Sequence, residues 1–78
     1  MKSVIIYSTN GCVYCKMAKA YFDQKGVTYV EKNVQSDLVA QEEMIKKSGQ
    51  LGVPVLDIEG TIIIGFDKSA INEAVGIK

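Results

Sequence analysis

A short apolar run followed closely by an amphipathic helical pattern constrains the fold of this chain most. Residues 4–7 are continuously apolar, as expected of a central strand buried on both faces. Residues 8–11 (Ser-Thr-Asn-Gly) indicate a turn, and from Val13 onward apolar residues recur at helical spacing. The apolar residues of this helix are Tyr14, Met17, Ala18, Tyr21 and Phe22. A strand that leads directly into a helix predicts an α/β protein.

The middle of the chain continues the alternation with a second strand and a second helix. Residues 27–34 alternate well enough to predict a strand with Val30 and Val34 in the core. Ser36 or Asp37 can cap the helix that follows. The apolar residues of this helix, which we expect to face the core, are Leu38, Met44 and Ile45.

After residue 52 the pattern changes to two short strands and a last helix. Strands are predicted over residues 54–58 and 61–64, and the Glu59-Gly60 pair between them is a hairpin signal. Asp67 can cap the final helix. The apolar residues of that helix are Ala70, Ile71, Ala74 and Val75.

The predicted order of elements is therefore βαβαββα. Two strands joined through a helix run parallel with a right-handed crossover, whereas the hairpin adds an antiparallel pair. We expect one α/β domain over residues 1–78, with a four-stranded mixed sheet flanked by helices on both faces.

The composition argues against several classes of function. With 47% hydrophobic and 23% charged residues the chain is typical of compact proteins, and 9 basic residues balance 9 acidic ones. A net charge of zero favours neither nucleic acid nor a membrane surface as a partner. The apolar run near the N-terminus is too short for a signal-peptide core, and none approaches the roughly 18 residues of a membrane span. We expect a cytoplasmic monomer.

Cys12 and Cys15 are the only cysteines of the chain. They stand three residues apart at the predicted start of a helix, where residues i and i+3 share one face. Their Cα separation can then fall within the roughly 4.4 to 6.8 Å that a disulfide tolerates. The free N–H groups and the helix dipole favour a thiolate at Cys12. Because a thiolate is the species that attacks disulfides, Cys12 is the candidate nucleophile and Cys15 the candidate resolving thiol.

Other uses of a cysteine pair stay open at this point. A structural disulfide is disfavoured because the cytosol keeps thiols reduced and closing so short a loop stabilises little. Zinc would need two more ligands, and the chain has neither a second cysteine pair nor a histidine. Small copper chaperones also carry C-x-x-C at a loop-to-helix junction. They usually have Met where this chain has Asn10, and their order of elements is βαββαβ.

Four segments resemble the glutaredoxins, a family of the thioredoxin superfamily. They are Tyr7-Ser8, residues 12–16, residues 52–55 and residues 65–67, and the resemblance covers essentially the whole chain. It implies a thioredoxin-like fold, no bound cofactor or metal, and thiol-disulfide exchange on glutathione and disulfide-containing proteins. It also implies a cis Val53-Pro54 bond whose backbone pairs with the substrate like an added strand.

The resemblance also implies which residues contact the substrate. The backbone N–H groups of Phe66 and Asp67, at the start of the last helix, would hold a carboxylate of glutathione. Tyr14, between the cysteines, either shapes the groove or belongs to the core. The expected substrate-binding residues are therefore Tyr14, Val53, Pro54, Phe66 and Asp67.

Several departures from the glutaredoxin pattern bear on the electron donor. Thr9 and Leu51 stand where glutaredoxins typically place basic residues, and Ile64 replaces the first glycine of their Gly-Gly-x-Asp motif. These losses, and Val13 in the active-site motif, resemble redoxins that are reduced by thioredoxin reductase and serve ribonucleotide reductase. Iron-sulfur binding by a dimer with glutathione is a further alternative, which Cys15 disfavours because such glutaredoxins usually have a single active-site cysteine.

Overall fold

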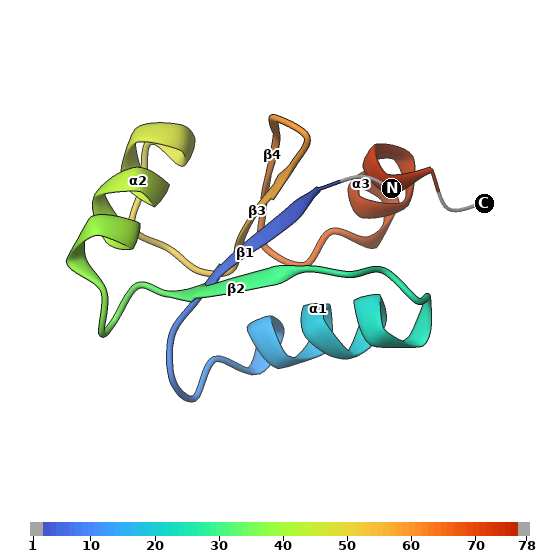
Figure 1. The fold of residues 1–78 in the computed structure, drawn as a ribbon, viewed down its shortest axis with the longest axis horizontal. Coiled ribbons are helices and arrows are strands. Elements are labelled where there is room, and N and C mark those ends of the chain that lie inside the picture. The colour runs from blue at the N-terminus through green and yellow to red at the C-terminus, as the bar shows by residue number, and fades with distance from the viewer. Residues whose placement is uncertain (1–2, 77–78) are drawn as a thin grey trace.

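A computed structural model describes residues 3–76 as a four-stranded sheet with helices on both faces (Figure 1). The order of elements is the predicted βαβαββα. The elements are β1 (Val4–Ser8), α1 (Val13–Gln24), β2 (Val30–Asn33), α2 (Leu38–Ser48), β3 (Val55–Ile58), β4 (Thr61–Ile64) and α3 (Lys68–Val75).

The strands are ordered β2-β1-β3-β4 in the sheet. β1 pairs parallel with β2 and antiparallel with β3, and β3 pairs antiparallel with β4. β1 thus has a neighbour on each side, and its sequence is apolar on both faces because helices cover both faces of the sheet. Glu59 and Gly60 both have positive φ (52° and 91°), as a tight hairpin turn requires. The predicted mixed sheet is confirmed.

Alternate residues of β1 face two separate apolar clusters. Val4 and Ile6 pack with Phe22 of α1 and Ile71 of α3. Tyr7 packs with Met44 of α2 instead. We call these sides the α1 face and the α2 face, and Figure 1 shows α2 separated from α1 by the strands.

The apolar residues of the predicted helices are only partly buried. In α1 the buried residues are Cys15, Ala18, Tyr21 and Phe22, whereas Tyr14 and Met17 are 60% and 43% exposed. In α2 the buried pair is Ala40 and Met44, four residues apart on one face. Leu38, two residues before Ala40, points to the other side of the helix and is 72% exposed, while Ile45 lies at the border.

The predicted boundaries also shift at three strands. Ser8 is the last residue of β1 and not part of the turn, and β2 begins at Val30, three residues later than predicted. Val30 is exposed because it opens an edge strand, whereas Val34 is buried as predicted. Pro54 immediately precedes β3. At the start of α2, Asp37 is the cap, and its carboxylate accepts the N–H groups of residues 39 and 40.

Candidate functional site

Cys12 and Cys15 form a disulfide at the start of α1, with their Cα atoms 5.2 Å apart. Cys12 is the N-cap, and its Sγ accepts the backbone N–H of Cys15 at 3.2 Å. A sulfur therefore occupies the place of the side-chain oxygen that usually caps a helix. In the reduced protein the same N–H and the helix dipole favour a negative charge on this sulfur.

The two sulfurs differ in their access to solvent. Cys12 is half-buried, whereas Cys15 is 1% exposed and belongs to the buried side of α1. Val13 and Tyr14, between them, are 66% and 60% exposed. Tyr14 is therefore not a core residue, and its role in a groove beside the dithiol stays a prediction.

Two hydrogen bonds tie the loop before Cys12 to the end of β2 and the loop that follows it. The backbone N–H of Asn10 donates to Oε1 of Gln35 at 3.1 Å, and Nδ2 of Asn33 donates to Oδ1 of Asn10 at 2.7 Å. These contacts join segments far apart in the sequence and fix the approach of the chain to Cys12.

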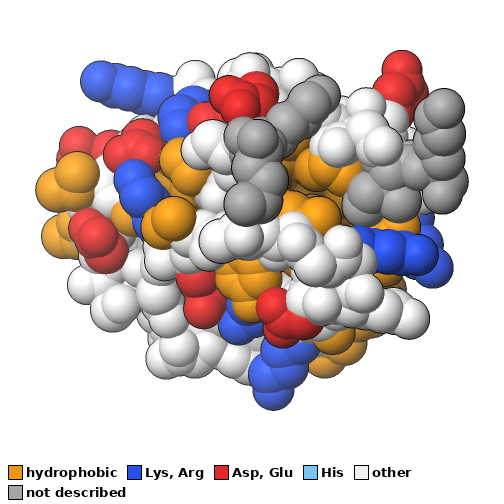
Figure 2. Space-filling view, turned by 45° about the vertical axis from the view of Figure 1, so that its right-hand side comes forward, with side chains coloured by type: hydrophobic (Ala, Val, Ile, Leu, Met, Phe, Trp, Pro, Cys, Tyr) orange, Lys and Arg blue, Asp and Glu red, His pale blue; other side chains and the backbone are white. Residues whose placement is uncertain are grey.

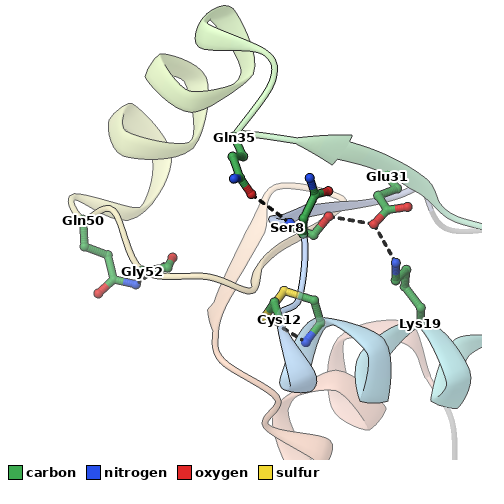
Figure 3. The surroundings of a disulfide bond; sticks show 9 residues. Ser8, Cys12, Lys19, Glu31, Gln35, Gln50 and Gly52 are labelled. Carbon is green, nitrogen blue, oxygen red and sulfur yellow. Dashed lines mark hydrogen bonds and ion pairs between the residues drawn. A yellow bond between two sulfur atoms is a disulfide. The ribbon is translucent and has the colours of Figure 1, made fainter.

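The Val53-Pro54 bond is cis, as the resemblance implied. Pro54 is buried, and its C=O accepts the N–H of Gly65 at 2.8 Å, which ties this segment to the residue that follows β4. The backbone of Val53 makes no hydrogen bond to another described residue. Figure 3 shows the loop of residues 50–52, which leads into this bond, in the surroundings of the disulfide.

Asp67 caps α3, as predicted, and its carboxylate accepts the N–H of Ala70 at 3.1 Å. The ring of Phe66 packs edge-on against Tyr21, with centroids 5.9 Å apart. The side chains of Phe66 and Asp67 therefore both have structural roles, and their backbone N–H groups are the parts suited to an anionic ligand.

A polar cluster near the disulfide has no counterpart in the sequence predictions. Ser8 is 1% exposed and is the one fully buried polar residue among residues 3–76. Its Oγ donates to Oε2 of Glu31 at 2.7 Å, and Nζ of Lys19 donates to the same oxygen at 2.7 Å (Figure 3). The bonds from Lys19, first, and Ser8 lower the pKa of Glu31. No local pattern links three residues on three different elements, so the sequence alone gave no signal.

The three positions that depart from the glutaredoxin pattern carry no charged side chain. Thr9 is half-buried, and Leu51 and Ile64 are 62% and 54% exposed. On the face drawn in Figure 2, acidic and basic side chains are interspersed with apolar ones. Residues 3–76 contain no group of three or more His, Cys, Asp or Glu placed to hold a metal ion. Nor does any helix of this part of the chain have the length and apolarity to cross a membrane.

Residues 4–63 match the family model for glutaredoxin. This chain belongs to the glutaredoxin family. A relative described as an uncharacterized glutaredoxin-like 8.6 kDa protein in the rubredoxin operon of Clostridium pasteurianum is 44% identical over 70 residues, 90% of this chain and 93% of that protein. Glutaredoxin 3 of Escherichia coli K12 is 40% identical over 67 residues, 86% of this chain and 81% of that protein.

Solved structures of the same fold include two kinds of glutaredoxin-like protein. The glutaredoxin-like NrdH-redoxin from Escherichia coli, described as having a thioredoxin-like activity profile, superposes with a TM-score of 0.80 at 27% identity, over 91% of this chain and 92% of that chain. A buckwheat glutaredoxin in complex with glutathione superposes with a TM-score of 0.75 at 26% identity, over 97% and 72%. The predicted thioredoxin-like fold is confirmed, and the family and the Cys12-Cys15 pair indicate a thiol-disulfide oxidoreductase.

Proposed function

We propose that this glutaredoxin-family protein reduces disulfides of proteins and mixed disulfides of glutathione, with Cys12 as nucleophile and Cys15 as resolving thiol. The observation that carries the proposal is the difference between the two sulfurs. The half-buried Cys12 Sγ caps α1 and accepts an N–H group, whereas Cys15 is 1% exposed. An incoming disulfide therefore meets Cys12 first.

The reaction proceeds through two exchanges. The Cys12 thiolate attacks one sulfur of the substrate disulfide, the substrate S–S bond breaks, and the leaving thiolate takes a proton. Cys15 then attacks Cys12 Sγ, releases the second substrate thiol and leaves the Cys12-Cys15 disulfide. Two electrons have passed from the dithiol to the substrate, and an external thiol donor returns them. No resident cofactor is needed.

The substrate lies between the start of α1 and the two segments that the Gly65-to-Pro54 hydrogen bond joins. The unpaired backbone of Val53, next to the buried Pro54, pairs with the substrate chain in the manner of an added strand. The exposed Tyr14 forms the opposite wall of this groove. The N–H groups of Phe66 and Asp67, at the start of α3, bind the carboxylate of a glutathionyl group.

Glutathione is the proposed electron donor, and reduction by thioredoxin reductase in the service of ribonucleotide reductase is the second candidate. The second is favoured by the uncharged Thr9, Leu51 and Ile64, and by the likeness to NrdH-redoxin. The absence of each charge-assisted contact weakens the free energy of glutathione binding by about 1.5 to 3 kcal/mol. That corresponds to about tenfold or more in affinity per contact.

We place the protein in the cytoplasm as a monomer.

Two assays run side by side separate the donors. One follows turnover of a small mixed disulfide with glutathione and glutathione reductase, and the other follows insulin reduction with NADPH and thioredoxin reductase. Turnover in the first assay supports glutathione, whereas activity in the second alone contradicts it. Thr9→Lys serves as a gain-of-function control, because a charge-assisted contact restored at this position raises kcat/KM for glutathione about tenfold.

A further inference from the structure

Three side-chain amides hold the loop that leads to Cys12. The backbone N–H of Asn10 donates to Oε1 of Gln35 at 3.1 Å, and Nδ2 of Asn33 donates to Oδ1 of Asn10 at 2.7 Å. Figure 3 shows the Gln35 side chain reaching from the loop after β2 toward this loop. Within the described part of the chain, residues 9–11 make no other hydrogen bond to a segment outside their own loop. We call these three side chains the amide clamp.

Asn33 also holds the turn in which it lies, at the end of β2. Its Oδ1 accepts the backbone N–H groups of residues 35 and 36 at 2.9 and 3.3 Å. An asparagine that stabilises a turn through its oxygen still has its Nδ2 group to donate, here to Asn10. The N–H of Val34 donates to the C=O of Ser8 at 2.9 Å. The clamp therefore ties the loop before Cys12 to a turn that is itself bonded to β1.

The helix holds Cys12 from the other side. The C=O of Cys12 accepts the N–H of Lys16 at 3.2 Å, and its Sγ accepts the N–H of Cys15 at 3.2 Å. Gly11 joins this cap to the clamp, and its φ of 73° lies in the left-handed region that glycine adopts without strain. The backbone of Cys12 is thus held between the first turn of α1 and a loop fixed at Asn10.

Reduction removes the covalent bond that holds the Cys12 sulfur. In the disulfide form Sγ of Cys12 is bonded to Cys15, whereas in the reduced protein it keeps its place only through the N–H of residue 15 and the backbone on either side. We infer that Asn10, Asn33 and Gln35 position the nucleophile. They hold the loop so that the sulfur of reduced Cys12 stays at the start of α1, where the helix favours its thiolate. This inference rests on the proposed function, in which Cys12 attacks as a thiolate.

The clamp carries no charge, so its effect can be separated from that of nearby charges. Residues 8–11, 33–36 and 52–54 contain no titratable side chain. The titratable side chains on the elements around Cys12 are Tyr14, Lys16 and Lys19 of α1, Glu31 and Lys32 of β2, Asp37 before α2 and Asp67 before α3. Replacing a clamp residue by alanine alters none of these groups. A change in the Cys12 pKa in such a variant therefore reports a change in where the sulfur lies.

Asn72 of α3 provides a matched control. Its Oδ1 accepts a hydrogen bond from the hydroxyl of Tyr21, which ties α3 to the second half of α1. Asn72→Ala therefore removes a side-chain amide and a hydrogen bond between two elements, as the clamp variants do. Only the clamp variants release the loop before Cys12.

The test measures the pKa of Cys12 in a protein with a single thiol. Cys15→Ser leaves only Cys12 to react and keeps the backbone N–H that its sulfur accepts. The rate of alkylation by iodoacetamide is followed by intact mass between about pH 4 and pH 10, and its midpoint gives the pKa. The variants added to this background are Asn10→Ala, Gln35→Ala, Asn33→Ala, the pairs Asn10→Ala with Gln35→Ala and Asn10→Ala with Asn33→Ala, and the control Asn72→Ala.

We expect the midpoint to rise by about 0.5 to 1 pH unit when Asn10→Ala and Gln35→Ala are combined, and by less than about 0.2 unit in Asn72→Ala. Below the midpoint the clamp variants react more slowly than the control. Above it they react at least as fast, because a more basic thiolate is a stronger nucleophile. Asn10→Ala adds nothing to Asn33→Ala, because both remove the same hydrogen bond.

The outcomes separate the two proposals. Asn10 and Gln35 are exposed, so their alanine variants keep the fold, which circular dichroism checks. Equal midpoints in the protein with both substitutions and in Asn72→Ala overturn the positioning role while leaving the proposed function intact. Disulfide turnover that persists in Cys12→Ser overturns the proposed function, and the positioning role with it.

Discussion

The two faces of the sheet carry the same polar arrangement in different surroundings. On the α1 face Ser8 donates to Glu31, and on the α2 face the neighbouring residue, Tyr7, donates to Glu43. Each glutamate also pairs with a lysine, at 2.7 Å and 2.9 Å respectively. Because Ser8 and Tyr7 are adjacent in β1, their side chains necessarily point to opposite faces.

The two arrangements differ in what else they contact. Lys47 of α2 donates to the Tyr7 hydroxyl at 2.9 Å and to Asp57 of β3 at 2.6 Å, so the α2-face network ties one helix to the central strands. The Ser8 cluster is smaller and lies beside a redox pair. The comparison teaches that one hydrogen-bonding pattern can tie a helix to the central strands on one face and form a small, separate cluster on the other.

The largest expected effects concern the two cysteines, which both lie at the start of α1. Cys12→Ser is expected to abolish disulfide turnover with every donor, whereas Cys15→Ser spares monothiol turnover with glutathione, because a glutathionyl intermediate on Cys12 needs no resolving thiol. The mixed-disulfide assay measures both. Equal loss of turnover from either change would contradict the assignment of roles.

On the α2 face, substitutions are expected to change stability and not turnover. Met44→Ala removes a fully buried side chain and should cost about 2 to 5 kcal/mol of unfolding free energy. Leu38→Ala on the same helix should cost less than about 0.5 kcal/mol, because Leu38 is 72% exposed. Urea unfolding of the reduced proteins gives both values. A Met44→Ala protein that stays folded yet loses turnover would break the division between the faces.

The Tyr7 hydroxyl tests the α2-face network alone. Tyr7→Phe keeps the buried ring but removes the bonds to Glu43 and Lys47, which lie 3.6 Å apart and can still pair with each other. We expect a loss of about 1 to 2 kcal/mol of unfolding free energy. The rate of mixed-disulfide resolution should match that of the wild type, and a fall in that rate would place Tyr7 in the reaction.

The smallest expected effect is a loss of stability in acid. Hydrogen bonds from Tyr7, first, and Lys32 lower the pKa of Glu43 from 4.5 to about 2. Because the folded pKa lies below the unfolded one, the Glu43 carboxylate stabilises the fold above about pH 4.5, and this contribution fades as the pH falls toward 2. With the side chain 34% exposed, we expect about 1 kcal/mol.

Urea midpoints measured between pH 2 and 6 test the acid effect. The wild type should lose stability over this range by more than Glu43→Gln does. Identical pH profiles for the two proteins would show that the network contributes nothing through this carboxylate.

The order of elements could be predicted because it rests on local signals. Apolar spacing, the caps Asp37 and Asp67 and the Glu59-Gly60 turn act within a few residues of each other, and the structure confirms them. Whether Leu38 or Ala40 faces the sheet depends on how the helix docks. That rotation is set by distant strands, so the prediction for Leu38 was wrong.

The features of the site could be predicted from the sequence to different extents. The position of Cys12 and Cys15 at a helix start followed from the sequence, and the cis bond before Pro54 followed only from the family resemblance. The Ser8 cluster was missed because its partners lie 12 and 23 residues apart in the sequence and meet only through the pairing register. Local sequence patterns do not indicate such contacts.

Selective alkylation of the reduced protein tests the central claim, the division of roles between the two cysteines, most directly. Brief treatment with iodoacetamide near pH 7 is followed by acid quenching and peptide mass mapping. Because Cys12 is half-buried at the helix N-terminus and Cys15 is 1% exposed, the account predicts label on Cys12 alone. Label shared equally between the two cysteines, or found first on Cys15, would contradict it.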